Sequence, residues 1–245
     1  MDLSGRRVVV AGGTGSVGEG LVRGFARAGA EVIVPSRSQR RADQFRGVLG
    51  EDAEADRVRI VVADYTTPEA AVQLADRVEA EFGPVTDGAA AIGGWWSGGP
   101  LWSTSQVAWQ EYFVNFATAH LAMAQAFVPR LPAEGAYHIM LGGSAVFPVP
   151  GSGIVSMQQA ALMMMGRVLQ SETQGRRRVF THLLGVVNNR NRPQHRAEWI
   201  SATDVGALAA ALSADPAIAS EHYELLDHDA FLRAWEAVRG AEVNA

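Results

Sequence analysis

Glycines concentrate in one short turn near the start of the chain, after a run of β-branched residues. The turn reads Gly12-Gly13-Thr14-Gly15-Ser16-Val17-Gly18 and follows Val8-Val9-Val10-Ala11. Glycines let the chain turn sharply and let bare backbone N–H groups approach a pyrophosphate at the positive end of a helix. With a strand before it and a helix and a second strand after it, the turn predicts a dinucleotide site. Its expected cofactor contacts are Gly12, Thr14, Gly15, Ser16, Val17 and Gly18; a strand-to-helix turn without a ligand is the alternative.

The residues that follow the second predicted strand indicate which dinucleotide is bound. In this type of fold an acid at that point would hydrogen-bond the ribose hydroxyl of NAD. The stretch here is Pro35-Ser36-Arg37-Ser38, which has no acid. Because an arginine can pair with a 2′-phosphate, Ser36, Arg37 and Ser38 predict NADP(H) rather than NAD(H). Arg40 and Arg41 either add to this positive field or form a solvated helix face.

Strands and helices alternate along the chain, which is the arrangement that would position such a turn. Apolar runs predict strands at 8–11, 31–34, 58–63, 85–92, 137–141, 179–187 and 222–226. Helical patterns occupy 17–28, 40–49, 66–83, 106–128, 155–170, 203–212 and 231–238. Thr66 with Glu69 has the spacing of a capping box, and Thr203 is the expected cap of a later helix. The pattern predicts a single α/β domain, 1–245, with a Rossmann-type doubly wound parallel sheet of about seven strands and helices on both faces.

Composition and charge exclude several classes of protein. The net charge of -5 argues against a nucleic-acid partner, and the basic run 176–178 is interpreted as a solvated loop. Without cysteine, disulfides, thiolate metal sites and a cysteine nucleophile are ruled out. No signal peptide precedes the first strand and no stretch is long enough to span a membrane, so a cytoplasmic protein is expected.

From about Val8 to Leu226 the sequence resembles the short-chain dehydrogenase/reductase family. The glycine turn resembles that family's TGxxxGIG motif, with Ala11 in place of the threonine and Ser16 in place of the middle glycine. The family's NNAG stretch corresponds to 90–93, where both asparagines are absent. The resemblance also implies cofactor contacts after the third, fourth and sixth strands, at Asp64, Tyr65, Ala91, Gly185 and Val187.

The resemblance breaks at the residues with which this family moves protons. Val155 and Gln159 stand where the family has its active tyrosine and lysine. Gly142 stands at the serine position, and Ser144 takes over that role if the loop after it is two residues shorter than usual. Asn115 matches the family's helix asparagine. The resemblance therefore implies Asn115 and Ser144 as catalytic residues that polarise the substrate, with a serine in a strand-end turn as the alternative for Ser144.

Two classes of function follow from these losses. General acid catalysis is worth roughly 10²–10⁴-fold, so its loss cripples ketone reduction without forbidding hydride transfer. The first class is an NADP(H)-dependent oxidoreductase acting on a small apolar or aromatic molecule by an atypical mechanism, with the proton coming from water or an unidentified group. The alternative is a dinucleotide-binding protein without redox turnover, such as a sensor, a partner subunit, or a non-redox lyase or isomerase.

A few other side chains are candidates for replacing the missing acid. These are His120, His138, His182 and Tyr112, each of which is otherwise explained as a core residue, with His138 expected to be partly buried in its strand. No pair of carboxylates or histidines has metal-ligand spacing, so no metal is expected.

Aromatic and methionine side chains indicate contact surfaces. Trp95 and Trp96 lie between glycines just after the fourth strand and form either an apolar wall for a flat substrate or a core or subunit contact. The run 163–165 of methionines makes its helix apolar around most of its surface, which indicates burial between subunits. By resemblance, this helix and the one holding Asn115 would form the interface of a homodimer or homotetramer.

Overall fold

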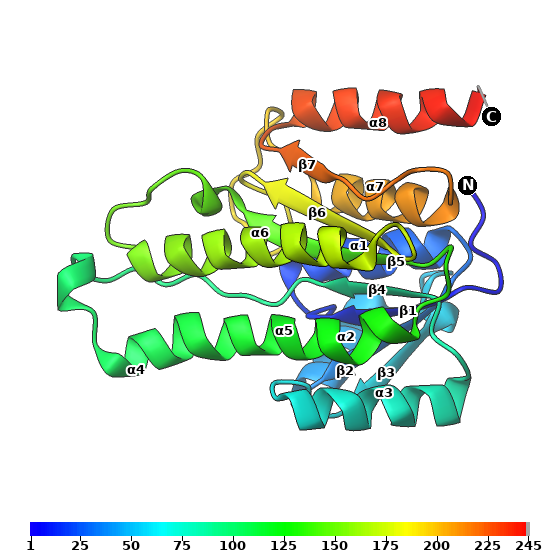
Figure 1. Ribbon diagram of the computed structural model, residues 1–245, viewed down its shortest axis with the longest axis horizontal. Coiled ribbons are helices and arrows are strands. Elements are labelled where there is room, and N and C mark those ends of the chain that lie inside the picture. Colours follow the sequence, from blue (N-terminus) through cyan, green and yellow to red (C-terminus); the bar gives the residue numbers. More distant parts are fainter. Residues whose placement is uncertain (244–245) are drawn as a thin grey trace.

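A seven-stranded parallel sheet forms the centre of the molecule in a computed structural model that describes residues 1–243, with side chains to residue 240 (Figure 1). The strand order is β3-β2-β1-β4-β5-β6-β7, and each neighbouring pair is parallel. The strands are β1 (Arg7–Ala11), β2 (Glu31–Ser36), β3 (Val58–Val62), β4 (Asp87–Ala90), β5 (Ala136–Gly142), β6 (Arg178–Leu184) and β7 (His222–Leu225). The predicted α/β doubly wound parallel sheet is confirmed.

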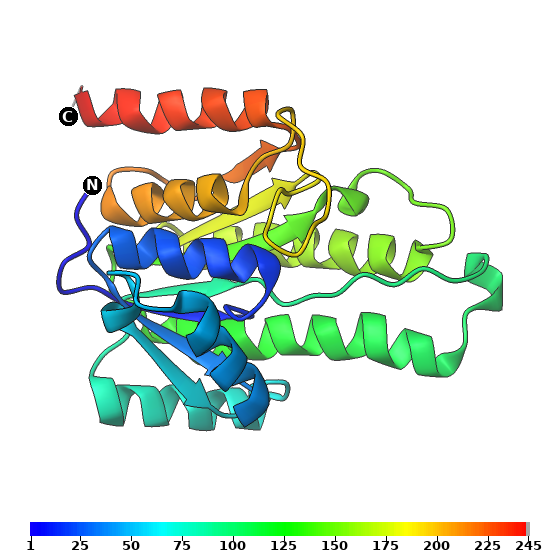
Figure 2. The ribbon, with the colours of Figure 1, turned by 180° about the vertical axis from the view of Figure 1, so that it is seen from behind.

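Helices cover both faces of the sheet, so each face has its own apolar core (Figures 1 and 2). One core lies under α1 (Ser16–Arg27), α2 (Gln39–Leu49), α7 (Ala202–Ala214) and α8 (His228–Val243). The other lies under α3 (Pro68–Phe82), α5 (Asn115–Phe127) and α6 (Gly153–Thr173). Burial on both faces explains why the strands read as continuous apolar runs and not as alternating patterns.

Helices α1 and α7 approach each other so closely that their backbones touch. A Cβ atom on Gly24 would lie 2.4 Å from the carbonyl carbon of Gly206, and one on Gly206 would lie 1.9 Å from the Gly20 oxygen. Only glycine fits at such crossings, because any side chain would push the helices apart. These glycines therefore fix the position of α1, whose N-terminus follows the glycine turn.

The predicted helix caps and the predicted basic loop need correction. Thr67, not Thr66, caps α3 by accepting a hydrogen bond from the Ala70 N–H. Ser201, not Thr203, caps α7 and forms a capping box with Asp204. Arg178 is not in a solvated loop, because it lies buried in β6 and donates to four backbone carbonyls.

Two strands end earlier than their apolar runs, and this difference creates the site. The runs predicted strands to residues 92 and 187, but β4 ends at Ala90 and β6 at Leu184. The residues beyond leave the sheet and become loops at its carboxyl edge, where ligands bind in open α/β sheets.

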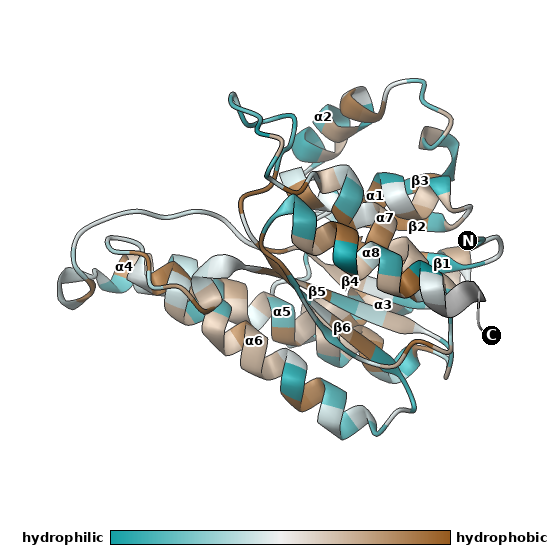
Figure 3. Cartoon of the chain, turned by 90° about the horizontal axis from the view of Figure 1, so that it is seen from above, coloured by the Kyte–Doolittle hydropathy of each residue, from teal (hydrophilic) through white to brown (hydrophobic). Residues whose placement is uncertain are grey.

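The predicted helix 106–128 is one helical stretch with a change of winding. It comprises α4 (Gln106–Trp109), a π-helical turn (Gln110–Val114) and α5, and α5 runs beside α6. Both extend past the sheet to form an arm with the loops 91–105 and 146–152 at its end (Figures 1 and 3). A π turn often marks a functional site, because it re-aims the side chains that follow it.

Candidate functional site

The glycine turn joins the end of β1 to the start of α1 and leaves the helix end open. Gly12 has a φ of +76°, and a Cβ there would lie 2.3 Å from the Ala91 oxygen. A Cβ on Gly18 would lie 2.1 Å from the Gly12 oxygen, so both glycines are required by the chain's own packing. Gly15 is the N-cap of α1 and supplies no side chain to its N–H groups. The turn therefore presents bare backbone donors and the positive end of a helix, which fits a dinucleotide diphosphate.

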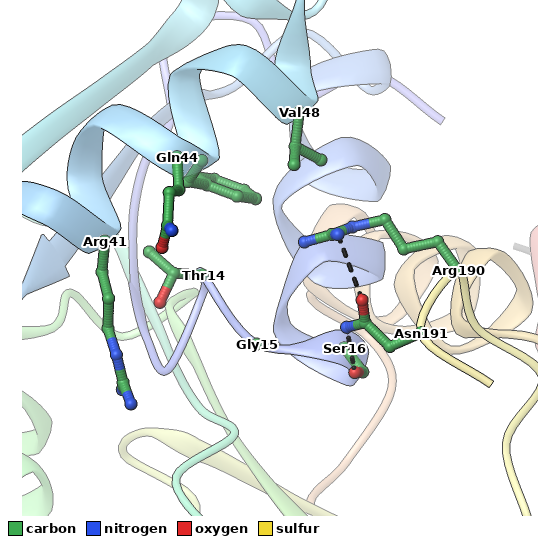
Figure 4. Close-up of a pocket in the computed structure, with 9 residues that line it drawn as sticks. Thr14, Gly15, Ser16, Arg41, Gln44, Val48, Arg190 and Asn191 are labelled. Carbon is green, nitrogen blue, oxygen red and sulfur yellow. Dashed lines mark hydrogen bonds between the residues drawn. The ribbon is translucent and has the colours of Figure 1, made fainter.

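Two cavities open beside this turn. The larger, about 630 Å³, lies between the start of α1, helix α2 and the loop after β6 (Figure 4). The smaller, about 320 Å³, lies at the carboxyl ends of β4, β5 and β6. Both are lined by Gly15 and Ser16, so an elongated ligand could extend from one to the other across the turn.

At the end of β2 the predicted ribose contacts are already engaged in local structure. The Ser36 hydroxyl donates to the Ser38 carbonyl over 3.0 Å, and the Ser38 hydroxyl caps α2 by accepting from the Arg41 N–H. Arg37 is exposed near Asp64 and contributes to the lowering of its pKa. Of the three, Arg37 has the exposed, charged side chain, and its contact with a 2′-phosphate stays a prediction.

Asp64 forms a small hydrogen-bonded turn after β3. Burial acts to raise the pKa of its carboxyl, but donors from Thr66 and from the Tyr65 backbone outweigh this effect, so the pKa is lowered. These donors all meet Oδ1, at 2.7 to 3.0 Å. Tyr65 itself is buried, and burial raises the pKa of its hydroxyl.

Among the described residues that line the smaller cavity, none has a titratable side chain. Its described lining residues are Gly15, Ser16, Val17, Ala91, Ile92, Gly93, Met140, Leu141, Gly142, Gln159, Leu184, Gly185 and Val187. The predicted contacts Ala91, Gly185 and Val187 therefore lie together at the place expected for the nicotinamide end. Among these residues only Ser16 and Gln159 have polar side chains, and neither side chain acts as an acid or a base in water.

Gln159 is held rigidly at the wall of this cavity. Its Oε1 accepts from the Gly142 N–H over 2.7 Å, and its Nε2 donates to Gln158 over 2.8 Å. A Cβ on Gly142 would lie 3.6 Å from Ser144 Oγ and 3.8 Å from Gln159 Oε1. Ser144 and Gln159 thus flank the position to which the family resemblance assigns a serine, while Val155 is buried in α6.

Asn115 does not join this group. Its side chain is exposed, its Oδ1 accepts from Gln110 across the π turn over 2.9 Å, and it is not among the residues that line either cavity. The structure thus brings Ser144 near the cavity and leaves Asn115 outside it.

The candidate histidines lie in the core and not at the site. His120, His138 and His182 are all fully buried, so the expectation of a partly buried His138 was wrong. His120 donates from Nε2 to the Ile92 carbonyl over 2.7 Å, and burial lowers its pKa to about 4. His138 hydrogen-bonds His182 and Ser213, each over 3.0 Å. Burial and His182 hold the pKa of His138 well below its usual range.

The aromatic loop after β4 packs partly against the arm. Trp96 lies 6.1 Å from Tyr112, ring centre to ring centre, so Tyr112 belongs to an aromatic cluster. Trp95 keeps 65% of its surface exposed. Trp96 is therefore an anchor of the loop, and Trp95 is the ring that remains available for a ligand or a subunit.

Sequence reasoning missed the loop after β6. Asn191 reaches back to the glycine turn and donates to Ser16 Oγ over 2.8 Å (Figure 4). Arg190 pairs with Glu19 of α1. The polar run Asn188-Asn189-Arg190-Asn191-Arg192 directly after an apolar strand was the signal available.

No three histidine, aspartate or glutamate side chains within the described part of the chain are grouped so that they could hold a metal ion. None of the helices in the same part combines the length and the apolar composition needed to cross a membrane.

Comparison with known proteins agrees with this architecture. Among solved structures, a short chain oxidoreductase from Pseudomonas aeruginosa PAO1, described as containing an atypical catalytic center, superimposes with a TM-score of 0.80. The match is 19% identical and covers 92% of this chain and 97% of that one. A short chain dehydrogenase from Burkholderia cenocepacia J2315 in complex with NADP has a TM-score of 0.79 and 21% identity, covering 92% and 98%. At these identities the likeness concerns the fold.

Sequence relatives lead to the same family. A 1-deoxy-11-beta-hydroxypentalenate dehydrogenase from Streptomyces exfoliatus is 31% identical over 185 residues, which are 71% of this chain and 64% of the relative. The match thus spans just under two thirds of that relative's length. A short-chain type dehydrogenase/reductase from Picea abies is 30% identical over 181 residues, 71% of this chain and 67% of the relative. Residues 6–197 match the short chain dehydrogenase family, and the chain belongs to that family.

Proposed function

We propose that this protein binds NADP(H) and transfers hydride to or from a small apolar or aromatic molecule by an atypical mechanism, without the tyrosine and lysine that serve the family as proton donor. The observation that carries the proposal is the smaller cavity, which adjoins the open glycine turn and has no titratable side chain among its described lining residues. The family membership supports the oxidoreductase class, and the NADP in one fold neighbour supports the cofactor.

The chain's own residues would hold the cofactor along the carboxyl edge of the sheet. Backbone donors of the glycine turn would bind the diphosphate, Arg37 would meet a 2′-phosphate, and Gly185 and Val187 would border the nicotinamide. When bound, that group supplies or accepts a hydride. Gln159, at the wall of the cavity, would position the ribose or the substrate through its carboxamide.

Proton transfer is what these residues cannot do. No lysine occurs anywhere in the sequence, so no lysine can lower the pKa of a catalytic tyrosine at any position. Ser144 can donate a hydrogen bond that polarises a carbonyl, but it cannot serve as an acid near neutral pH. The substrates that fit are those whose product takes its proton from water at little cost, such as an activated alkene, an iminium or a stabilised enolate.

A second function, dinucleotide binding without redox turnover, is favoured by the same cavity. A lining without an acid or a base suits a sensor or a partner subunit as well as an atypical enzyme. We place it second because hydride transfer itself needs no titratable group, and because the curated relatives are dehydrogenases.

Assembly as a homodimer or homotetramer is part of the proposal. Large apolar side chains stay exposed on α5 and α6, among them Leu121, Met164 and Val168 at 44%, 55% and 44%. Exposed large apolar side chains on two neighbouring helices favour a protein interface at this face. Light scattering on the purified protein would show the expected dimer or tetramer, and a monomer at micromolar concentration would contradict it.

The test is a titration with NADPH and NADH, followed by cofactor fluorescence and by calorimetry. Tight NADPH binding with weak NADH binding is expected, and a panel of ketones, iminiums and activated alkenes then tests hydride transfer. Transfer to the activated substrates but not to ketones would support the enzyme, whereas binding without any transfer would leave the second function. Failure to bind either nucleotide would refute both.

A further inference from the structure

Two arginines from different elements line the larger cavity. Arg41 comes from the first turn of α2 and Arg190 from the loop after β6, with Thr14, Gly15 and Ser16 of the glycine turn between them (Figure 4). The remaining described lining residues are Gln44, Phe45, Val48 and Asn191. The lining therefore carries two positive charges and, among these residues, no carboxylate.

The loop that brings Arg190 to the cavity is fixed at its base. Asn188 exchanges backbone hydrogen bonds with Ile200 and Ala202, at 2.8 and 2.9 Å. Its side chain also donates to the carbonyls of Arg196 and Trp199, at 2.7 and 3.0 Å. These bonds hold the two ends of the loop together, so the loop forms a strap that starts and finishes beside α1 and α7.

At its tip the strap is attached to α1 by two polar contacts. Arg190 pairs with Glu19, and Asn191 donates to Ser16 Oγ over 2.8 Å. The Arg190 side chain is 43% exposed and that of Glu19 is 13% exposed, so water weakens the ion pair from the arginine side. Glu19 also pairs with Arg23 over 3.1 Å, so it keeps a cation if Arg190 moves away. A stronger anion in the cavity could therefore draw Arg190 from Glu19 at low cost.

We propose that Arg190 is a phosphate-binding residue of the cofactor site and that it acts with Arg41 from the opposite wall of the cavity. The inference rests on the proposed function, because the phosphate is that of the dinucleotide. The N-terminus of α1 has no side-chain cap and favours an anion, and the two guanidinium groups can each bind phosphate oxygens in a two-pronged geometry. The strap over residues 188–202 is thereby tied to the bound cofactor.

The test uses four ligands that separate the two phosphate positions. NADPH and 2′,5′-ADP carry the 2′-phosphate, whereas NADH and ADP-ribose carry the diphosphate alone. Calorimetry is performed on the wild-type protein and on Arg190→Ala. Arg192→Ala is the matched control, because Arg192 lies on the same strap, over the Trp199 ring at 5.2 Å, and outside the cavity lining.

Arg190→Ala is expected to weaken binding by about tenfold or more, because a hydrogen-bonded ion pair with phosphate is lost. If only NADPH and 2′,5′-ADP bind more weakly, Arg190 contacts the 2′-phosphate. If NADH and ADP-ribose also bind more weakly, Arg190 contacts the diphosphate. Either result supports the inference. Binding within twofold of wild type for all four ligands, or an equal loss in Arg192→Ala, would overturn it while leaving the proposed function intact. If the wild-type protein binds none of the four, the proposed function fails and the inference with it.

Discussion

Acidification from pH 7.5 to pH 5 should strongly destabilise the protein through its three fully buried histidines. The Ile92 carbonyl can only accept, so His120 carries its proton on Nε2, and its Nδ1 is buried without a partner among the described residues. Burial lowers the pKa of His120 from 6.5 to about 4 and that of His182 to about 3. The pKa of His138 also lies well below its usual range because of burial and of its neighbour His182.

The sign and size of the effect follow from proton linkage. Because each folded-state pKa lies below the unfolded value, the unfolded chain binds more protons as the pH falls through 6.5, and stability is lost below that pH. A pH of 5 is about 1.5 units below the pKa of a histidine in the unfolded chain. This difference corresponds to a loss of about 2 kcal/mol in the free energy of unfolding for each such histidine. The folded-state pKa values of His120 and His182 lie below 5, so these two histidines together account for a loss of about 4 kcal/mol, a large share of the stability of a domain. The lowered pKa of His138 acts in the same direction.

Urea unfolding followed by tryptophan fluorescence at both pH values measures this loss. His120→Gln keeps a donor for Ile92 but cannot take up a proton, so it should reduce the loss by about 2 kcal/mol. His195→Gln is the control, since His195 is exposed on the strap, and it should leave the loss unchanged. A free energy of unfolding that differs by less than about 1 kcal/mol between the two pH values would show that the buried histidines do not control stability in acid.

Three further predictions concern packing, charge and catalysis. Gly24→Ala would place a Cβ 2.4 Å from Gly206 and should lower the free energy of unfolding by about 1–3 kcal/mol. Gly47→Ala is the control, because a Cβ there would have no atom within 4 Å, and it should raise the free energy of unfolding by about 0.5–1 kcal/mol. Arg6→Met would leave the fully buried Asp87 carboxylate without its cation at 2.8 Å and should cost about 3 kcal/mol in chemical denaturation. With an activated substrate, the single-turnover rate of hydride transfer should not change between pH 6.5 and pH 9.5, because no titratable side chain is among the described residues of the smaller cavity. A tenfold rate change over that pH interval would reveal a proton donor that the structure does not show.

The fold could be predicted because local and global signals agree in this chain. The β-branched run 8–11, the glycine turn and the return to Glu31–Ser36 identify one βαβ unit, and such units build a parallel sheet. Strand ends were less predictable. The apolar run continues to Val187, but β6 ends at Leu184, level with the ends of its neighbours β5 and β7.

The site could be predicted only where chemistry is local in sequence. The glycine turn places its own N–H groups, whereas the side chain of Arg190 reaches the turn through a strap more than 170 residues away from Ser16. No periodicity in the sequence predicts such a contact. The same limit applies to the buried histidines, since β5 and β6 are apolar on both faces and give no alternation that would show which side chains face the ligand.

We infer that the smaller cavity is competent for hydride transfer and lacks only the proton donor. Grafting the donor back tests this most directly, with Gly142→Ser, Val155→Tyr and Gln159→Lys combined in one variant. Gly142 has an extended backbone, with φ at -90°, and the nearest atom to an added Cβ is 3.6 Å away, so a serine fits there. We expect NADPH-dependent ketone reduction in the variant, with a rate gain of about 10²-fold or more over the wild-type protein. A correctly folded variant that still binds NADPH and gains no ketone reductase activity would contradict the claim.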